Sequence, residues 1–331
     1  MPLTSLSRTA CAAVAAVALF PLAAQAQRAE GSFERTLTVG QQPDVEIESG
    51  SGGIEVRQGS AGRVEVRGRI RSSNDWGWRR GRYSAEERVK RLEANPPVTQ
   101  SGNVVRIGRI DDEDLRNGVS ISYEVIVPAA STLRSRTGSG SQRIEGVEGS
   151  VEVSSGSGSL VLRRAGGRVK ANTGSGGITA DAIGGEFEAS SGSGSISATG
   201  IGGAMTVHTS SGQIEATQTG SGDVNASSSS GSVRVRGVKG GVRASTSSGG
   251  LHIEGQMARE WRLSTASGSV TVDVPSDQGL ELDANTGSGS IDVDFPITVS
   301  GTIGKRSLRG SARGGGPLLH VRTSSGGISI Q

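Results

Sequence analysis

Residues 169–216 read VKANTGSGGITADAIGGEFEASSGSGSISATGIGGAMTVHTSSGQIEA, and a period of nine residues runs through them. Two apolar residues separated by one polar residue recur at this spacing. The pairs are Val169/Ala171, Ile178/Ala180, Phe187/Ala189, Ile196/Ala198, Met205/Val207 and Ile214/Ala216. Spacing of i, i+2 places both apolar side chains on one face of a short strand. Each unit is therefore predicted to be a strand with one buried face.

Two kinds of turn alternate between these strands. A Gly-Gly step comes before Phe187 and Met205, whereas a turn containing Ser-Gly comes before Ile178, Ile196 and Ile214. One coil therefore takes two strands and 18 residues, and stacked coils bury a continuous aliphatic core. The sequence predicts an all-β fold, a β-solenoid with two short strands per coil. We expect Ile178, Ile196 and Ile214 in one buried column and Phe187 and Met205 in another.

The period extends on both sides of this stretch. It begins at Val151, continues to Ile291 with steps of nine to eleven residues, and resumes within residues 319–330 after a Gly-, Arg- and Ser-rich loop at 301–316. About ten coils, at ~4.8 Å each, predict a rod about 50 Å long over residues 136–331. An antiparallel meander is the alternative fold, because short Gly-rich turns also connect the strands of hairpins.

Residues 27–135 are less regular and are predicted to form the first coils and an N-terminal β cap. The turn SGSGGIEV at 49–56 is related to the later repeats. A solenoid needs such a cap, because an uncovered end strand invites edge-to-edge association. The insertion at 73–97 breaks the β pattern. Within it Ser84 is a helix N-cap candidate, and the short helix that follows must stop at Pro96.

The first 26 residues have the pattern of a signal peptide. Arg8 precedes a small, apolar run at 10–24, and Ala24-Gln25-Ala26 is the small-x-small pattern that signal peptidase cleaves. No later stretch approaches the roughly 20 apolar residues that a membrane span requires. We therefore expect export, a mature chain that starts at Gln27, and no transmembrane anchor.

Composition excludes several classes of chemistry. Cys11 is the only cysteine, so the mature chain has no thiol for disulfides, nucleophilic catalysis or thiolate metal sites. Cys11 also lies at the start of the apolar run and not at its end, where a lipid-attachment cysteine would be. The 35 basic and 32 acidic side chains leave a formal net charge of +3. Such a balance neutralises little phosphate, so a nucleic-acid partner is not expected.

Motifs for metal and cofactor binding are not found. The histidines His208, His252 and His320 belong to different coils and are assigned structural or surface roles, because a zinc site needs closely spaced ligands. The turns have the wrong composition for a calcium-binding β-roll, since acids such as Asp223 occur only sporadically at the corners. The acidic run at 111–114 is interpreted as a solvated loop. We expect no cofactor, no metal and metal-independent folding.

Carboxylates give the best argument for an enzyme. Solenoid lyases and hydrolases align carboxylates, or a carboxylate with Arg or Lys, on one face of adjacent coils. Asp273, Asp283, Asp292 and Asp294 would meet this requirement if their coils stack. The competing interpretation is the ordinary polar face of an alternating strand, which we favour.

One segment combines large aromatic side chains with positive charge. It lies in the insertion before the predicted helix and contains Trp76, Trp78, Arg79, Arg80, Arg82 and Tyr83. Trp and Arg are preferred interface anchors, and aromatic rings stack on sugars. The segment is therefore the candidate partner-binding site. Alternatively, its tryptophans cover the end of the core as part of the cap.

Three motifs, together with the signal peptide, carry a family resemblance. They are the strand SYEVIVP at 122–128 that leads into TGSG at 137–140, the repeated Ser-Gly-Ser-Ile turns, and LHVRTSSGGI at 319–328. In these features the chain resembles the bacterial putative-adhesin family of exported Gly/Ser-rich repeat proteins. The resemblance implies a repeat fold and an exported location rather than an activity.

These observations lead to one expected function and one alternative. We expect an exported, non-enzymatic, adhesin-like binding or scaffolding module of the cell envelope, located in the periplasm or at the cell surface. Its partner would be an envelope glycan or protein. The alternative is a polysaccharide-active β-helix enzyme, either a lyase or a hydrolase.

Overall fold

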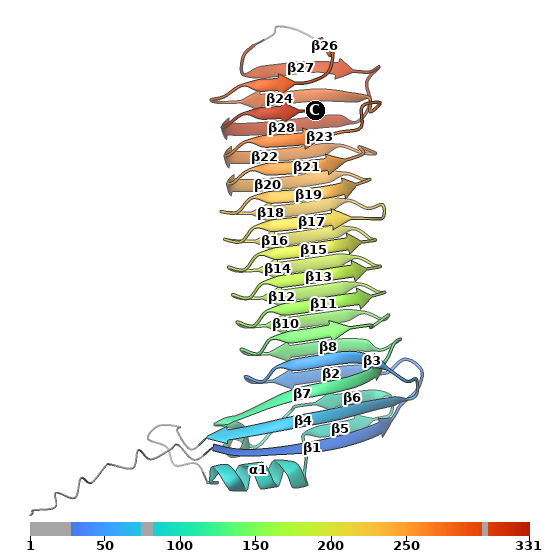
Figure 1. The fold of residues 1–331 in the computed structure, drawn as a ribbon, viewed down its shortest axis with the longest axis vertical. Helices are drawn as coiled ribbons and strands as arrows, with labels where there is room; N and C mark the ends of the chain where they lie inside the picture. The colour runs from blue at the N-terminus through green and yellow to red at the C-terminus, as the bar shows by residue number, and fades with distance from the viewer. Residues whose placement is uncertain (1–27, 74–81, 300–303) are drawn as a thin grey trace, which may run out of the picture.

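The chain forms a rod of stacked coils in the computed structural model, which describes residues 28–73, 82–299 and 304–331. Two long sheets run along the rod, sheet A with fourteen strands and sheet B with fifteen (Figure 1). Each regular coil gives one strand to each sheet. Strands of successive coils pair in parallel, as in Ile178↔Ile196, and hairpins would pair them antiparallel. The β-solenoid is confirmed and the meander is wrong.

The regular coils span residues 132–273. In sheet B they contribute β8 (Thr132–Thr137), β10 (Val151–Ser155), β12 (Val169–Thr173), β14 (Phe187–Ser191), β16 (Met205–Thr209), β18 (Val224–Ser228), β20 (Val242–Ser248) and β22 (Trp261–Ser267). In sheet A they contribute β9 (Gln142–Glu145), β11 (Leu160–Ala165), β13 (Ile178–Ile183), β15 (Ile196–Ile201), β17 (Ile214–Gln218), β19 (Val233–Val238), β21 (Leu251–Gly255) and β23 (Val270–Asp273).

The core consists of stacked aliphatic columns between the two sheets. Ile178, Ile196 and Ile214 pair directly along sheet A, and each is at most 1% exposed. Phe187 pairs with Met205 in sheet B, and both are buried. Both predicted columns are confirmed. Each such side chain contributes roughly 1.5–3 kcal/mol through burial, so the stack is stabilised along its whole length.

A hydroxyl ladder holds the corner between each sheet B strand and the next sheet A strand. The Thr173 hydroxyl donates a hydrogen bond to the Gly158 carbonyl of the preceding coil at 2.9 Å and accepts one from the Gly176 amide at 3.2 Å. A Cβ at Gly176 would lie 2.1 Å from the Gly158 oxygen. A hydroxyl residue and a glycine three positions later are therefore both required, which explains the Thr/Ser-x-x-Gly turns.

The N-terminal region forms the predicted cap, with elements of both sheets. They are β1 (Arg28–Thr38), β2 (Asp44–Ser49), β3 (Ile54–Gly59), β4 (Arg63–Ser73), α1 (Ala85–Ala94), β5 (Val98–Ser101), β6 (Val104–Ile107), α2 (Glu113–Arg116) and β7 (Val119–Pro128). Antiparallel pairing of β1 with β4 and of β4 with β7 ends sheet A, and α1 packs against β1 and β4 (Figure 1). Covered in this way, the last sheet A strands offer less edge to a second chain.

The helix of the insertion begins where the sequence predicts. Ser84 caps α1, and Glu87 completes a capping box with its side chain on the Ser84 amide. The helix ends at Ala94, directly before Asn95 and the two prolines. Val89 and Leu92 are buried against the sheet. Among the described residues, no helix has the length and apolar character that crossing a bilayer would take.

Coils at both ends of the rod are stacked out of sequence order. At the N-terminal end, β2 and β3 lie between the β8–β9 coil and the cap strands β6 and β7. The C-terminal elements are β24 (Leu280–Thr286), β25 (Ile291–Val293), β26 (Thr298–Val299), β27 (Ser307–Ala312), β28 (Leu318–Ser325) and β29 (Ile328–Ile330). Of these, β28 and β29 insert between the β22–β23 coil and the β24–β25 coil.

Residues 301–316, which the sequence analysis interprets as a loop, are partly a strand in the structure. Part of this segment forms β27, which pairs antiparallel with β24 and covers the outer edge of that strand. The other edge of β24 is then free to pair in parallel with β28. The last strands of the sequence are therefore not the last layer of the rod.

Candidate functional site

The candidate partner-binding segment is only partly described. Trp76, Trp78, Arg79 and Arg80 lie outside the described residues. Arg82 and Tyr83 directly precede α1 at the N-terminal end of the rod. The Tyr83 ring is half-buried beneath the guanidinium of Arg91, 4.2 Å from the ring centroid. Arg82 is exposed, and its Nε lies 3.9 Å from a carboxylate oxygen of Asp114.

A buried arginine joins α1 to the neighbouring cap segments. Arg88 is 6% exposed, and its Nε donates to the carbonyl of Asp114 at 3.1 Å. Its Nη1 donates to the carbonyl of Ser73 at 3.4 Å. These contacts hold together α1, the end of β4 and the short helix α2. The acidic run at 111–114 is therefore not a free loop, since Asp112 caps α2 by accepting from the Asp114 amide.

A groove runs between α2 and the first corner of the solenoid, and we call it the cap groove. The part beside α2 and the corner at Ser49 and Gly50 has a volume of about 540 Å³. A second depression continues it toward the ends of β1 and β4, and the two share Arg116 and Val119. Its apolar side chains are Ile110, Val119, Ile121 and Tyr123, and its charged side chains are Arg109, Arg116, Arg136, Glu48 and Asp111.

The three arginines of the cap groove differ in how they are paired. Arg109 Nε lies 3.1 Å from Asp111, and Arg136 Nη2 lies 3.8 Å from Glu152. The exposed Arg116 guanidinium has neither a hydrogen bond nor an ion pair with any other described residue. Because an unpaired guanidinium retains all its donors, the groove offers a strong binding group for an anion.

Tyr123 forms the aromatic part of the groove. Its ring packs edge-on to Phe33, with centroids 6.4 Å apart, and burial raises the pKa of its phenol. The hydroxyl therefore stays neutral and can both donate and accept a hydrogen bond. Gly108 passes close to it with φ +94°, and a Cβ there would lie 1.8 Å from the carbonyl oxygen of Glu48. Only glycine fits at this position.

The four aspartates considered for catalysis do not assemble. Asp273, Asp292 and Asp294 lie on or beside sheet A strands, but Asp283 lies on sheet B, where it pairs with Arg309 at 3.2 Å. The C-terminal coil separates Asp273 from the coil of Asp292 and Asp294. The condition that the coils of all four stack on one another is therefore not met, because the inserted C-terminal coil and the two-sheet geometry separate them.

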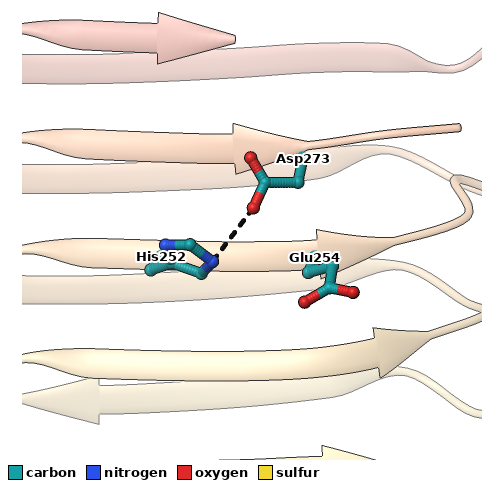
Figure 2. Close-up of side chains that lie close together, drawn as sticks. All are labelled: His252, Glu254 and Asp273. Atoms are coloured by element: carbon teal, nitrogen blue, oxygen red, sulfur yellow. Dashed lines mark ion pairs between the residues drawn. The ribbon is translucent and has the colours of Figure 1, made fainter. Parts of the chain in front are cut away.

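The histidines have different surroundings. His208 contacts the hydroxyl of Ser227 at 2.9 Å on sheet B. His320 Nδ1 lies 3.4 Å from Asp283. His252 Nε2 lies 3.0 Å from an oxygen of Asp273, and Glu254 is close to both (Figure 2).

Sequence analysis missed both the cap groove and the group around His252. The groove residues come from four separate segments without a shared motif, and nothing in the sequence indicates that they meet. The His252 group does have a signal. Glu254 and Asp273 are 19 residues apart, because this coil takes one step of ten residues and one of nine, so following the apolar positions from Leu251 to Val270 would have found them.

A family model matches the repetitive part of the chain, and two solved structures align with most of it. Residues 168–331 match the family model of the Toastrack DUF4097 domain. Two solved structures are similar. A putative cell adhesion protein from Clostridium sporogenes is 11% identical, with 91% of this chain and 99% of that chain covered and a TM-score of 0.19. A putative adhesin from Bacteroides fragilis is 10% identical, with 91% and 97% covered and a TM-score of 0.32.

No curated protein matches the chain in sequence. The cap groove, formed by residues between Glu48 and Gly138, lies outside the 168–331 match. The family comparison therefore describes the rod and leaves the groove to be interpreted from its own residues.

Proposed function

We propose that this chain is an exported, non-enzymatic, adhesin-like binding module of the cell envelope, which holds an anionic envelope glycan in the cap groove. The observation that supports it is the exposed guanidinium of Arg116, which has no partner among the described residues and lines one groove with Arg109, Arg136 and the half-buried Ile110 and Val119. Export rests on the signal-peptide pattern of the first 26 residues.

The residue types in the groove suit an acidic sugar. A guanidinium matches the carboxylate of a uronic acid, or a sugar phosphate, with two parallel hydrogen bonds. The half-buried Ile110 and Val119 offer apolar surface against which the C–H face of a sugar ring packs, whereas the Tyr123 ring is 2% exposed and belongs to the core. A pocket with an apolar lining and a few convergent polar groups is the usual form of a small-ligand site.

The rod supplies the second part of the proposed function. Its coils are tied to their neighbours by strand pairing, and its core is continuous from the cap to the C-terminal layer. A stack of this kind is rigid along its length. A ligand bound at the cap would therefore be held at a fixed distance from the other end. This arrangement favours a scaffold that presents one binding site.

Binding to polygalacturonate tests the glycan part of the proposal, and dextran, which is uncharged, is the negative control. We expect the mature chain to bind the polyuronate but not dextran, and the affinity to fall with added salt because the contact is ionic. Arg116→Ala should weaken binding by about tenfold or more, which corresponds to the ~1.5–3 kcal/mol of a hydrogen bond to a charged group.

Arg322→Ala is the matched control. Arg322 is exposed on β28, near the other end of the rod, and also has no ion pair among the described residues. Its replacement should leave binding unchanged. Equal losses of affinity in both variants would mean that the polyuronate binds through the overall positive charge of the protein and not at the cap groove. If the immobilised chain retained an envelope protein from a membrane extract and no glycan, its partner would be a protein, and the glycan part of the proposal would be wrong.

A polysaccharide-active enzyme is the second candidate, supported by a different set from the one expected. Glu254 and Asp273 lie on adjacent coils, and Arg236 Nε is 3.8 Å from Glu254. Carboxylates beside an arginine on one face are what solenoid lyases and hydrolases use. Release of reducing or unsaturated ends from a panel of polysaccharides, lost in Asp273→Asn, would favour the enzyme. A binding module releases none.

A further inference from the structure

The outer face of sheet A carries an imidazole and two carboxylates within reach of one another. His252 and Glu254 lie on β21, and Asp273 lies at the end of β23 (Figure 2). Their nearest nitrogen and oxygen atoms all lie within 4.8 Å of one another, and His252 Nε2 is 3.0 Å from Asp273 Oδ2. His252 and Asp273 are partly buried, and Glu254 is exposed.

Strand geometry fixes this juxtaposition. His252 and Glu254 are two residues apart, so their side chains project from the same face of β21. Glu254 pairs directly with Asp273 across the parallel ladder. Neighbouring strands are about 4.8 Å apart, which places paired side chains within the span of one coordinated ion. The group is therefore held by backbone pairing and not by a loop.

We propose that His252, Glu254 and Asp273 bind one divalent transition-metal ion of the zinc type. Zinc accepts both imidazole nitrogen and carboxylate oxygen at about 2.0–2.2 Å, and three protein ligands plus solvent make an open site. Calcium and magnesium instead take sets of oxygen ligands, so the imidazole disfavours them. Small side-chain rotations bring the present separations to those of a coordinated set.

The surroundings both assist and oppose a cation. Gln331 Nε2 donates to the other oxygen of Asp273 at 2.8 Å, which orients that carboxylate as outer contacts of metal ligands do. Two arginines of β19 oppose it: Arg236 has its Nε 3.8 Å from Glu254, and Arg234 pairs with His252 across the ladder. Arg236 also contacts Glu215 at 3.5 Å, so it keeps a partner when Glu254 turns toward the ion. Asp292 and Asp294 lie farther along the same sheet and add negative potential.

Zinc titration of the mature chain without an affinity tag tests the proposal. We expect isothermal titration calorimetry to detect one zinc ion per chain. His252→Ala and Asp273→Asn should each weaken binding by at least about tenfold, whereas Gln331→Ala should weaken it less. His208→Ala is the matched control, because His208 contacts a serine and no carboxylate. It should bind zinc like the natural chain.

Cobalt provides a readout that does not depend on affinity. Co²⁺ in the same site should give visible absorption bands of a low-coordinate nitrogen and oxygen environment, which His252→Ala should remove. All variants should melt within a few degrees of the natural chain without metal, because the three side chains lie on the surface.

Two results would overturn the metal site. The first is an absence of zinc binding at millimolar concentration, which would make His252 and Asp273 an ordinary ion pair. The second is equal zinc binding by the His252 and His208 variants. The His252→Ala variant should still bind polygalacturonate, because His252 does not line the cap groove. Failure of the metal site can therefore be told apart from failure of the proposed glycan site.

Discussion

The regular solenoid at 132–273 and the cap at 28–128 are built from the same one-sided strands but use them differently. In the solenoid each position is repeated in every coil, and each repeated residue has a packing or hydrogen-bonding task. Thr173 and Gly176 illustrate this, since both are needed at one corner. In the cap, residues such as Arg116 and Gly108 occur once and line the groove.

This difference indicates where binding chemistry is to be found in a repeat protein. A side chain that is repeated in every coil has the same packing role in each of them, so its presence reflects what the stack requires for stability. An unrepeated polar side chain without an internal partner has no such task. Among the described residues Arg116 meets this description, and His252 meets part of it, since it stands between Arg234 and Thr271 in its column of sheet A. Replacements in the repeat should therefore affect stability, and those in the cap should affect binding.

The largest expected effect comes from a charge in a core column. Ile196→Asp places a carboxylate at a 1% exposed position between Ile178 and Ile214. It should cost about 4 kcal/mol or more and unfold the stack cooperatively, because each coil is stabilised by its neighbours. Urea unfolding followed by circular dichroism measures this. Ser197→Asp, on the outward face of the same strand, should remain folded; unfolding of both variants equally would contradict the column.

A smaller effect is expected at the corners. Gly176→Ala should destabilise by about 1–3 kcal/mol, because its Cβ would meet the Gly158 carbonyl oxygen at 2.1 Å and the stacked coils cannot separate locally. Gly177→Ala is the matched control, with its nearest atom at 3.4 Å. Its stability should stay close to that of the natural chain. Similar urea midpoints for the two alanine variants would show that the close approach of neighbouring coils is not the reason for glycine at position 176.

The smallest effect on stability is expected in the cap insertion. Replacing Trp76 and Trp78 together by Ala should leave the melting temperature nearly unchanged, because α1 already covers the end of the sheet with Val89 and Leu92. If the segment contributes to binding, the same variant should bind polygalacturonate more weakly. A loss of several kcal/mol would instead assign the tryptophans to the cap, as expected for deleting buried aromatics.

The sequence by itself determined the repetitive fold. The i, i+2 pairs define which face of each strand is buried, and the 18-residue coil, two steps of nine, aligns Ile178 with Ile196 and Ile214. The helix of the insertion was equally readable, since Ser84, Glu87 and the prolines act within one or two turns. These features are local or strictly periodic, so a single pass along the chain reveals them.

Only the tertiary structure decided the order of the terminal coils and the two candidate sites. Whether β28 lies beside β22 or beyond β24 depends on which strand edges are left open, and β27 decides this by covering one of them. The cap groove joins segments that share no period. The coil spacing does indicate the pairing of β21 with β23, but the distance of 3.0 Å between His252 Nε2 and Asp273 is known only from the structure. Strand pairing between distant residues depends on the whole stack, so no local pattern encodes it.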